Sequence, residues 1–294
     1  MKIEYGISTK KIDVTSICLS KLKKDSIITI PIGDHNRAQY FGDPIRNVHK
    51  KVFIEIDNVI SEYDEFKQVK INILDNTIEL DDNSKYDSKL SEIHSKLKIK
   101  YGDFRSELPE QKMAIRYLTK DCKVLEIGGN IGRNALIIAS IVDCNNFVTM
   151  ESDGRIAKQL IENRDLNNFK FHIEDSALSN RKLVQKGWNT IPTDDLLPGT
   201  KWVNTISLDD LRSKYKIEFD TLILDCEGAF YYILMDMPNI LDNIKLIIME
   251  NDYNDITQKN YVDKVLVQNN FICDYKEFGG WGPCRNNFFE VWIR

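Results

Sequence analysis

One short segment sets the fold, and it is a largely apolar run that leads into glycines, Val124-Leu125-Glu126-Ile127-Gly128-Gly129-Asn130-Ile131-Gly132. Glycines at the turn from a first strand to a first helix let a ligand approach backbone N–H groups closely. A dinucleotide fingerprint requires Gly-x-Gly-x-x-Gly. Here three residues separate Gly128 from Gly132, and Asn130 stands in the place of the middle glycine. The segment therefore predicts a ligand-binding turn that fits a nicotinamide dinucleotide poorly.

Glu126 directly precedes the glycine turn and narrows the class of ligand. A carboxylate at this place would repel a pyrophosphate, but it could pair with the ammonium group of an amino acid, directly or through water. S-adenosylmethionine carries such a group. We expect the site to include Gly128, Gly129, Asn130 and Gly132. The alternative is a glycine turn that only lets helix and strand pack closely.

Strand-like and helix-like segments alternate after residue 120, which is typical of a parallel sheet covered by helices on both faces. The predicted strands are 122–127, 147–150, 170–173, 221–224 and 246–249, and the predicted helices include 131–141, 155–166 and 261–268. Two apolar runs at 271–275 and 288–293 are joined by a loop too short for a helix, so we expect them to pair antiparallel. The sequence thus predicts an α/β fold with a Rossmann-like, doubly wound mixed sheet of seven strands.

Residues 1–80 follow another pattern, in which apolar and polar residues alternate with a period of two. This alternation is typical of half-buried antiparallel strands, and Gly33-Asp34-His35-Asn36 is typical of a turn between them. We predict a small β-sandwich domain over 1–80, a helical linker over 81–104 and the main domain over 105–294. For the first domain we expect carbohydrate binding or self-association, since Arg37, Tyr40 and Phe41 look exposed, or else a domain that merely covers an apolar face of the main sheet.

The composition excludes several classes of protein. The 294 residues are 42% hydrophobic and 29% charged, which is the balance of a globular protein rather than a disordered one. A formal charge of −5 argues against a nucleic-acid partner. We expect a cytoplasmic protein without a membrane segment, because no window approaches about 20 apolar residues. Six scattered cysteines without a Cys-x-x-Cys pair, and four lone histidines, predict reduced thiols and no structural metal.

Acidic residues follow the second and third predicted strands. Glu151, followed by Ser152, could accept hydrogen bonds from both ribose hydroxyls of a nucleoside, as an acid at this place does in nucleoside-binding sheets. Asp175, followed by Ser176, could accept from an adenine amino group. The alternative in each case is a solvated carboxylate at the end of a strand.

Five strings occur in an order that we recognise, and they span about residues 105–294. They are Leu125-Glu126-Ile127-Gly128-Gly129-Asn130-Ile131-Gly132-Arg133-Asn134, Leu160-Ile161-Glu162-Asn163 with Leu166-Asn167, Ser176-Ala177-Leu178-Ser179, Thr205-Ile206-Ser207-Leu208-Asp209-Asp210-Leu211, and Phe219-Asp220-Thr221-Leu222-Ile223-Leu224-Asp225-Cys226-Glu227-Gly228-Ala229. In this the chain resembles FkbM-type S-adenosylmethionine-dependent methyltransferases. The resemblance implies a seven-stranded class I methyltransferase sheet and O-methylation of sugar or polyketide hydroxyls. Ile223 and Phe230 stand where the family usually has Lys and Glu.

Carboxylates after the fourth and fifth strands are the candidate catalytic residues. Methyl transfer from a sulfonium to a hydroxyl requires alignment of the reacting atoms and removal of a proton. We expect Asp225 to act as the base or to orient the hydroxyl, and Glu227 to bind a neighbouring hydroxyl, with Glu250 on the same rim. One alternative is that Glu227 caps the following helix. Another is that Asp225, Glu250 and Asp252 bind Mg²⁺, although the predicted site contains no metal.

Aromatic and amide side chains are the candidate acceptor ligands. Trp281 and Asn286 lie in a glycine-rich loop of the closing hairpin, and Trp188 lies in the irregular stretch after the third strand. An indole is a good platform for the apolar face of a sugar ring. Trp281 could equally be a lid that packs on the core.

Together these features predict an S-adenosylmethionine-dependent O-methyltransferase that acts on a hydroxyl of a glycan or glycosylated precursor and releases S-adenosylhomocysteine. The competing classes are a carbohydrate-binding protein on a degenerate methyltransferase scaffold, a metal-dependent O-methyltransferase of a small molecule, and a nicotinamide oxidoreductase. The sequence does not indicate the oligomeric state.

Overall fold

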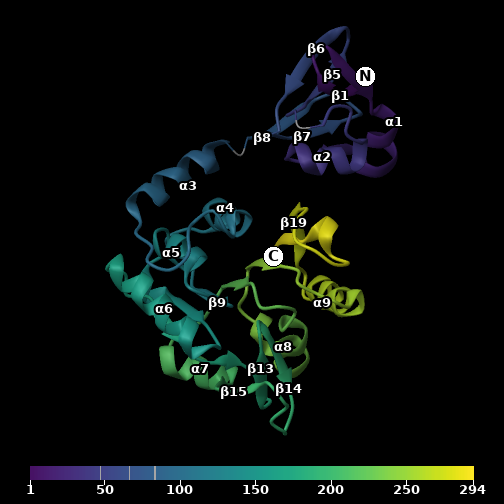
Figure 1. The fold of residues 1–294 in the computed structure, drawn as a ribbon. Helices are drawn as coiled ribbons and strands as arrows, with labels where there is room; N and C mark the ends of the chain where they lie inside the picture. Colours follow the sequence, from purple (N-terminus) through teal and green to yellow (C-terminus); the bar gives the residue numbers. More distant parts are fainter. Residues whose placement is uncertain (47, 66, 83) are drawn as a thin grey trace. The chain divides into compact units, whose positions relative to one another are not determined.

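The structure is a computed structural model that describes residues 1–46, 48–65, 67–82 and 84–294. The chain divides into two compact units, residues 1–88 and residues 89–294 (Figure 1). Helix α3 (Ser84–Lys96) begins in the first unit and ends in the second. In the described part of the chain, the search for helices with the length and hydropathy of a membrane span finds none.

The N-terminal unit consists of two four-stranded antiparallel sheets around one core. The first sheet has the order β2 (Lys10–Asp13), β1 (Lys2–Ile7), β5 (Lys51–Ile56), β6 (Val59–Tyr63), and the second has the order β3 (Lys23–Lys24), β4 (Ile27–Ile30), β7 (Lys67–Asn72), β8 (Ile78–Asp82). Alternate residues of both sheets, such as Ile3 and Val52 from one and Ile28 and Val69 from the other, are fully buried in the same cluster. Helix α1 (Thr15–Ile17) and a short π-helical turn, Cys18–Leu22, join β2 to β3.

The predicted turn at 33–36 is wrong, because helix α2 occupies Asp34–Phe41. Arg37 and Phe41 are buried rather than exposed, whereas Tyr40 is 38% exposed. The Arg37 guanidinium donates to the backbone carbonyls of Tyr63 (3.3 Å) and Lys67 (2.6 Å), one from each sheet. Arg37 therefore ties the two sheets together, and it offers nothing to a surface ligand.

The C-terminal unit is built on a seven-stranded sheet in the order β11-β10-β9-β17-β18-β20-β19. In chain order these are β9 (Val124–Ile127), β10 (Phe147–Met150), β11 (His172–Glu174), β17 (Thr221–Leu224), β18 (Leu246–Glu250), β19 (Ile272–Glu277) and β20 (Phe289–Ile293). The first five pair parallel, and β20 pairs antiparallel with both β18 and β19. Numbered along the chain, the spatial order is 3-2-1-4-5-7-6. This confirms the predicted α/β fold with its mixed sheet of seven strands.

Helices cover both faces of this sheet (Figure 1). Within β17, Ile223 packs in one buried cluster, while Leu222 and Leu224 pack in the other, as the period of two requires. The first cluster includes residues of α4 (Leu108–Tyr117), α5 (Arg133–Ala139) and α6 (Gly154–Leu166), and the second includes residues of α7 (Leu208–Tyr215), α8 (Phe230–Asp236) and α9 (Ile256–Gln268). The central strands β9, β10, β17 and β18 are therefore buried on both faces, which is why they are nearly continuous apolar runs.

The stretch after β11 is ordered rather than irregular. Strands β14 (Asn189–Pro192), β13 (Leu183–Lys186) and β15 (Lys201–Val203) form a separate antiparallel sheet in that order, and β12 (Ala177–Leu178) pairs with β16 (Thr205–Ile206). Short 3₁₀ turns lie at Cys144–Asn146, Pro238–Leu241 and Arg285–Asn287. The three-stranded sheet, called the insertion below, covers residues 183–203.

Candidate functional site

A cavity of about 430 Å³ opens at the carboxyl ends of β9, β10, β17 and β18. Among the described residues, its lining contains six carboxyl side chains and no lysine, arginine or histidine; the acids are Glu107, Glu110, Glu151, Asp225, Glu227 and Glu250. Nine residues predicted from the sequence line it: Gly128, Asn130, Glu151, Ser152, Ser176, Trp188, Asp225, Glu227 and Glu250. An acidic lining of this kind attracts cationic ligands and repels phosphates.

The glycine turn lies so close to the neighbouring strands that side chains do not fit. Gly128 has φ of +97°, and a Cβ there would lie 1.6 Å from the backbone oxygen of Asp225. A Cβ on Gly129 would lie 2.1 Å from Oγ1 of Thr149. The N–H groups of Gly128 and Gly129 donate to the carbonyl of Met150 at 3.1 and 2.8 Å. The glycines thus bring the turn against the ends of β10 and β17, where the cavity opens.

Glu151 connects the end of β10 to the glycine turn. Its Oε2 accepts from the backbone N–H of Asn130 at 2.9 Å, and its Oε1 accepts from the backbone N–H of Asp153 at 2.7 Å. Burial raises the pKa of Glu151, although these two backbone hydrogen bonds oppose the shift. Each carboxylate oxygen keeps a second lone pair for a ligand. Glu151 is therefore both fixed in orientation and able to accept further hydrogen bonds from the cavity.

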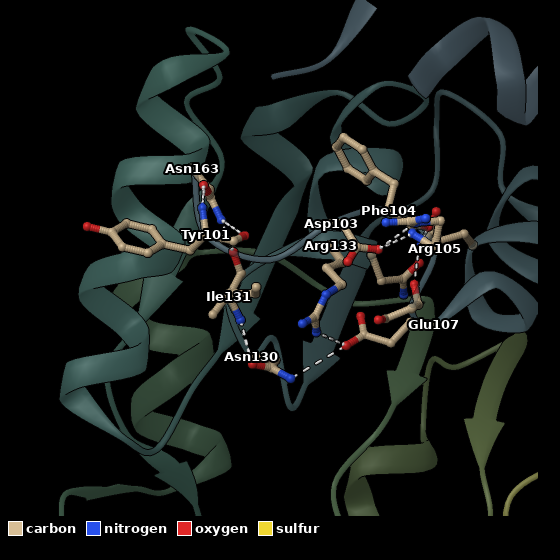
Figure 2. Close-up of polar contacts among 12 residues, drawn as sticks. Tyr101, Asp103, Phe104, Arg105, Glu107, Asn130, Ile131, Arg133 and Asn163 are labelled. Carbon is tan, nitrogen blue, oxygen red and sulfur yellow. Dashed lines mark hydrogen bonds and ion pairs between the residues drawn. The ribbon is translucent and has the colours of Figure 1, made fainter. Parts of the chain in front are cut away.

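A segment that ends at Glu107 leads into α4, which carries Glu110 at the same rim, and Asn163 on α6 holds that segment in place (Figure 2). The Asn163 side chain is buried, and its Nδ2 donates to the carbonyls of Tyr101 (3.2 Å) and Ile131 (2.8 Å). Glu107, at the start of α4, accepts from Arg133 Nη1 at 2.5 Å and from Asn130 Nδ2 at 3.5 Å. The sequence analysis missed Glu107 and Glu110, because neither follows a strand.

Three carboxyl groups meet at the inner end of the cavity. Glu110 from α4, Asp225 after β17 and Glu250 at the end of β18 each have an oxygen within 4.8 Å of the other two. Burial, together with Glu110 and Glu107, raises the pKa of Asp225 well above its usual range. Burial and a hydrogen bond with Glu110 likewise raise the pKa of Glu250. Burial and Glu227 raise the pKa of the nearby Asp252 to about 7.

Glu227 lies at the cavity and does not cap a helix. Helix α8 begins at Phe230 after Ala229, and no side chain caps it. Glu227 itself has φ of +50°, in the left-handed region that few non-glycine residues adopt. The turn formed with Gly228 (φ of +76°) lets both Asp225 and Glu227 line the same cavity. Such backbone strain clusters at binding and catalytic sites.

Three neighbours of these acids offer no charged side chain to the cavity. Ile223 and Phe230 are 3% and 1% exposed, so the positions where the resembled family has charged residues belong to the core here. Burial raises the pKa of Cys226 to about 12, which keeps that thiol protonated.

Six predicted site residues lie outside the lining of this cavity. Gly129 and Gly132 belong to the glycine turn but do not line the cavity. Asp175 is exposed, and its carboxylate lies beside Gly154. Trp281 and Asn286 are exposed and do not line the cavity, whereas Trp188 does. Glu126 borders a second, smaller cavity, and burial raises its pKa to about 8. Roles for these side chains stay predictions.

Comparison with known proteins finds matches among solved structures alone. A scan against models of protein families finds no match, and neither does a search of curated proteins. Among solved structures, a putative O-methyltransferase from Klebsiella pneumoniae is 15% identical, covers 71% of this chain and 88% of its own, and has a TM-score of 0.41. An O-methyltransferase from Bacillus cereus in complex with SAH is 13% identical (71% and 91% covered, TM-score 0.41).

A ribosomal protein L11 methylase from Lactobacillus delbrueckii subsp. bulgaricus is 14% identical, with 67% of this chain and 81% of that chain covered and a TM-score of 0.40. Because these TM-scores are below 0.5, we base the proposed function on the cavity of this chain and not on these neighbours.

Proposed function

We propose that this protein is an S-adenosylmethionine-dependent O-methyltransferase. The observation that carries the proposal is the acidic cavity at the carboxyl ends of the parallel strands, next to a glycine turn. Ligands of open α/β sheets bind at this edge. Six carboxyl side chains line the cavity, so a positively charged ligand is attracted and a negatively charged one is repelled. S-adenosylmethionine carries a positive sulfonium and a positive ammonium group, whereas a nicotinamide dinucleotide carries a negative pyrophosphate.

The residues present fit the cofactor. Glu151, held by two backbone N–H groups, would accept hydrogen bonds from the ribose hydroxyls. The backbone of Gly128 and the side chains of Ser152 and Ser176 line the same cavity and complete the nucleoside side. When bound, S-adenosylmethionine supplies a methyl group on a sulfonium. The protein supplies position, charge and a proton acceptor.

Asp225 is the residue that we assign to the reacting hydroxyl. It lies at the end of β17 on the cavity wall, between the glycine turn and the acids of α4 and β18. A carboxylate there accepts the hydrogen bond of the acceptor hydroxyl, fixes its direction and takes its proton. Glu227, exposed at the mouth of the cavity, would accept from a neighbouring hydroxyl.

The acceptor that we propose is a neutral sugar or glycan. Trp188 of the insertion is 60% exposed and lines the cavity, so its indole can stack on the apolar face of a sugar ring. Thr190 and Gln185 of the same sheet offer hydrogen-bonding groups beside it. An acceptor with a phosphate or carboxylate next to the reacting hydroxyl is disfavoured by the acidic lining.

Two measurements test the proposal. Calorimetry should show saturable binding of S-adenosylhomocysteine and no binding of NADH. The reverse result would favour the nicotinamide oxidoreductase alternative. With a labelled methyl group and a panel of neutral glycans, Asp225→Asn should slow methyl transfer by about 10²–10⁴ while leaving the affinity for S-adenosylhomocysteine nearly unchanged. Equal rates in the two proteins would remove Asp225 from the reaction. Binding without transfer to any glycan in the panel would favour the carbohydrate-binding alternative.

A further inference from the structure

A second, much smaller cavity adjoins the main one, and five of its twelve lining residues are acids. Its volume is about 10 Å³, which is close to the space that a single water molecule or a small ion occupies. Glu107, Glu110, Asp225 and Glu250 border both cavities, and Glu126 borders the small one alone. Five carboxyl groups thus surround a space that holds one small particle.

The spacing of three of these groups fits a single ion. The oxygens of Glu110, Asp225 and Glu250 all lie within 4.8 Å of one another. Two oxygens on opposite sides of Mg²⁺ or Ca²⁺ are about 4–5 Å apart, because each metal–oxygen distance is about 2.0–2.6 Å. The three ligands come from α4, the residue after β17 and the end of β18, so the fold itself holds them together.

Buried acceptors at this place have no hydrogen-bond donor. Glu110 is 6% exposed, and its Oε2 has no hydrogen-bond partner. The same holds for Oδ1 of Asn134, which also borders the small cavity. A buried acceptor without a partner is energetically costly. Two such oxygens beside one small space indicate that something electropositive belongs there.

Arg133 pairs with Glu107, which borders the small cavity but is not one of the three carboxyl groups. Among the ion pairs found in the described residues, none joins a lysine, arginine or histidine to Glu110, Asp225 or Glu250. We propose that these three carboxylates bind one divalent cation of the hard, oxygen-preferring kind, such as Mg²⁺, Mn²⁺ or Ca²⁺.

The proposal concerns ion binding and does not rest on methyl transfer. Asp225 has two oxygens and about four lone-pair positions, so it can coordinate an ion and still accept a hydrogen bond from the main cavity. The competing occupant is a proton shared between Glu110 and Glu250, which would also bring these two groups into contact. A metal titration separates the two occupants, because a cluster that is held by a shared proton shows no saturable binding of a divalent cation at neutral pH.

The test is a titration of the full chain, stripped with a chelator and free of cofactor, with Mn²⁺ at pH 7.5, followed by the loss of the free-ion electron paramagnetic resonance signal. We expect one Mn²⁺ per chain, saturable below about 1 mM and displaced by Mg²⁺ or Ca²⁺. Glu110→Gln should weaken this binding at least about tenfold. Asp175→Asn is the control, because Asp175 is exposed and borders neither cavity, and it should leave Mn²⁺ affinity unchanged.

The absence of saturable binding by folded wild-type protein would overturn the proposal. So would equal Mn²⁺ affinity in wild type, Glu110→Gln and Glu250→Gln, and the second variant decides the question if the first does not fold. A Glu110→Gln protein that gains stability at pH 8 without any change in Mn²⁺ binding would assign the cluster to a shared proton. Binding of S-adenosylhomocysteine is measured separately on the same samples, so a failed ion site and a failed cofactor site are distinguishable.

Discussion

Gly128→Ala should damage the protein far more than an alanine at another glycine with positive φ. The Cβ would lie 1.6 Å from the backbone oxygen of Asp225 and 2.6 Å from its carbonyl carbon, and neither backbone atom can rotate away. Positive φ costs a non-glycine residue about 1–2 kcal/mol. Overpacking against rigid neighbours adds about 1–3 kcal/mol. We therefore expect a total loss of about 2–5 kcal/mol in the free energy of unfolding.

Gly187→Ala is the matched control. Gly187 has φ of +63° in the turn between β13 and β14, and a Cβ there would meet nothing within 4 Å. Only the conformational cost of about 1–2 kcal/mol applies. The difference between the two variants isolates the contact of the glycine turn with the end of β17.

Urea unfolding followed by tryptophan fluorescence is the assay. All four tryptophans, at positions 188, 202, 281 and 292, lie in the unit formed by residues 89–294, so the signal reports on that unit alone. Affinity for S-adenosylhomocysteine is measured at low urea, where Gly128→Ala should bind much more weakly because the turn moves away from Asp225. Equal midpoints for Gly128→Ala and Gly187→Ala would refute the close approach of turn and strand.

Three further outcomes follow from named contacts. Glu151→Gln should weaken S-adenosylhomocysteine binding by about 1.5–3 kcal/mol in calorimetry, whereas Asp175→Asn, outside the cavity, should change this binding little. A larger loss of affinity in Asp175→Asn than in Glu151→Gln would contradict the assignment of Glu151 to the ribose. Lys259→Met leaves the fully buried Glu290 without its 2.8 Å partner and should cost about 3–5 kcal/mol of stability. Lys276→Met removes a partner that is 54% exposed and should cost less than about 1 kcal/mol, and similar urea midpoints would contradict this contrast. Although burial opposes it, Lys259 holds the pKa of Glu290 below its usual range. The resulting stabilisation is complete above the pKa of Glu290 in the unfolded chain, about 4.3, and is lost as the pH falls through its pKa in the folded protein. The stability difference between wild type and Lys259→Met should therefore shrink below about pH 4.

The sequence predicted the main sheet well, because a strand buried on both faces must be a short apolar run. It also predicted Glu151, Asp225 and Glu250 at one rim, because the carboxyl ends of parallel strands share an edge of the sheet. Glu110 could not be found in this way. It lies on a helix, and its place at the rim depends on Asn163, whose side chain holds the preceding segment through contacts distant in sequence.

The other differences have equally local causes. The strands of the insertion are short and carry exposed side chains such as Trp202, so no period of two stands out. Residues 34–41 follow Gly33 and begin with polar residues that are typical of a turn. They form a helix instead, and its buried Arg37 donates hydrogen bonds to both sheets. Tertiary contacts, rather than local sequence, determine the secondary structure of both segments.

The separate hydrogen bonding of the insertion has a consequence for local unfolding. Strands β13, β14 and β15 pair with one another, and none of them pairs with a strand of the seven-stranded sheet. They can therefore open as a small cooperative unit while the larger sheet stays closed. Native-state hydrogen exchange should show amides of 183–203 exchanging together and well before those of β9 and β17. Because this unit carries Trp188 and not the glycine turn, its opening would expose the acceptor side of the cavity and leave the nucleoside side intact.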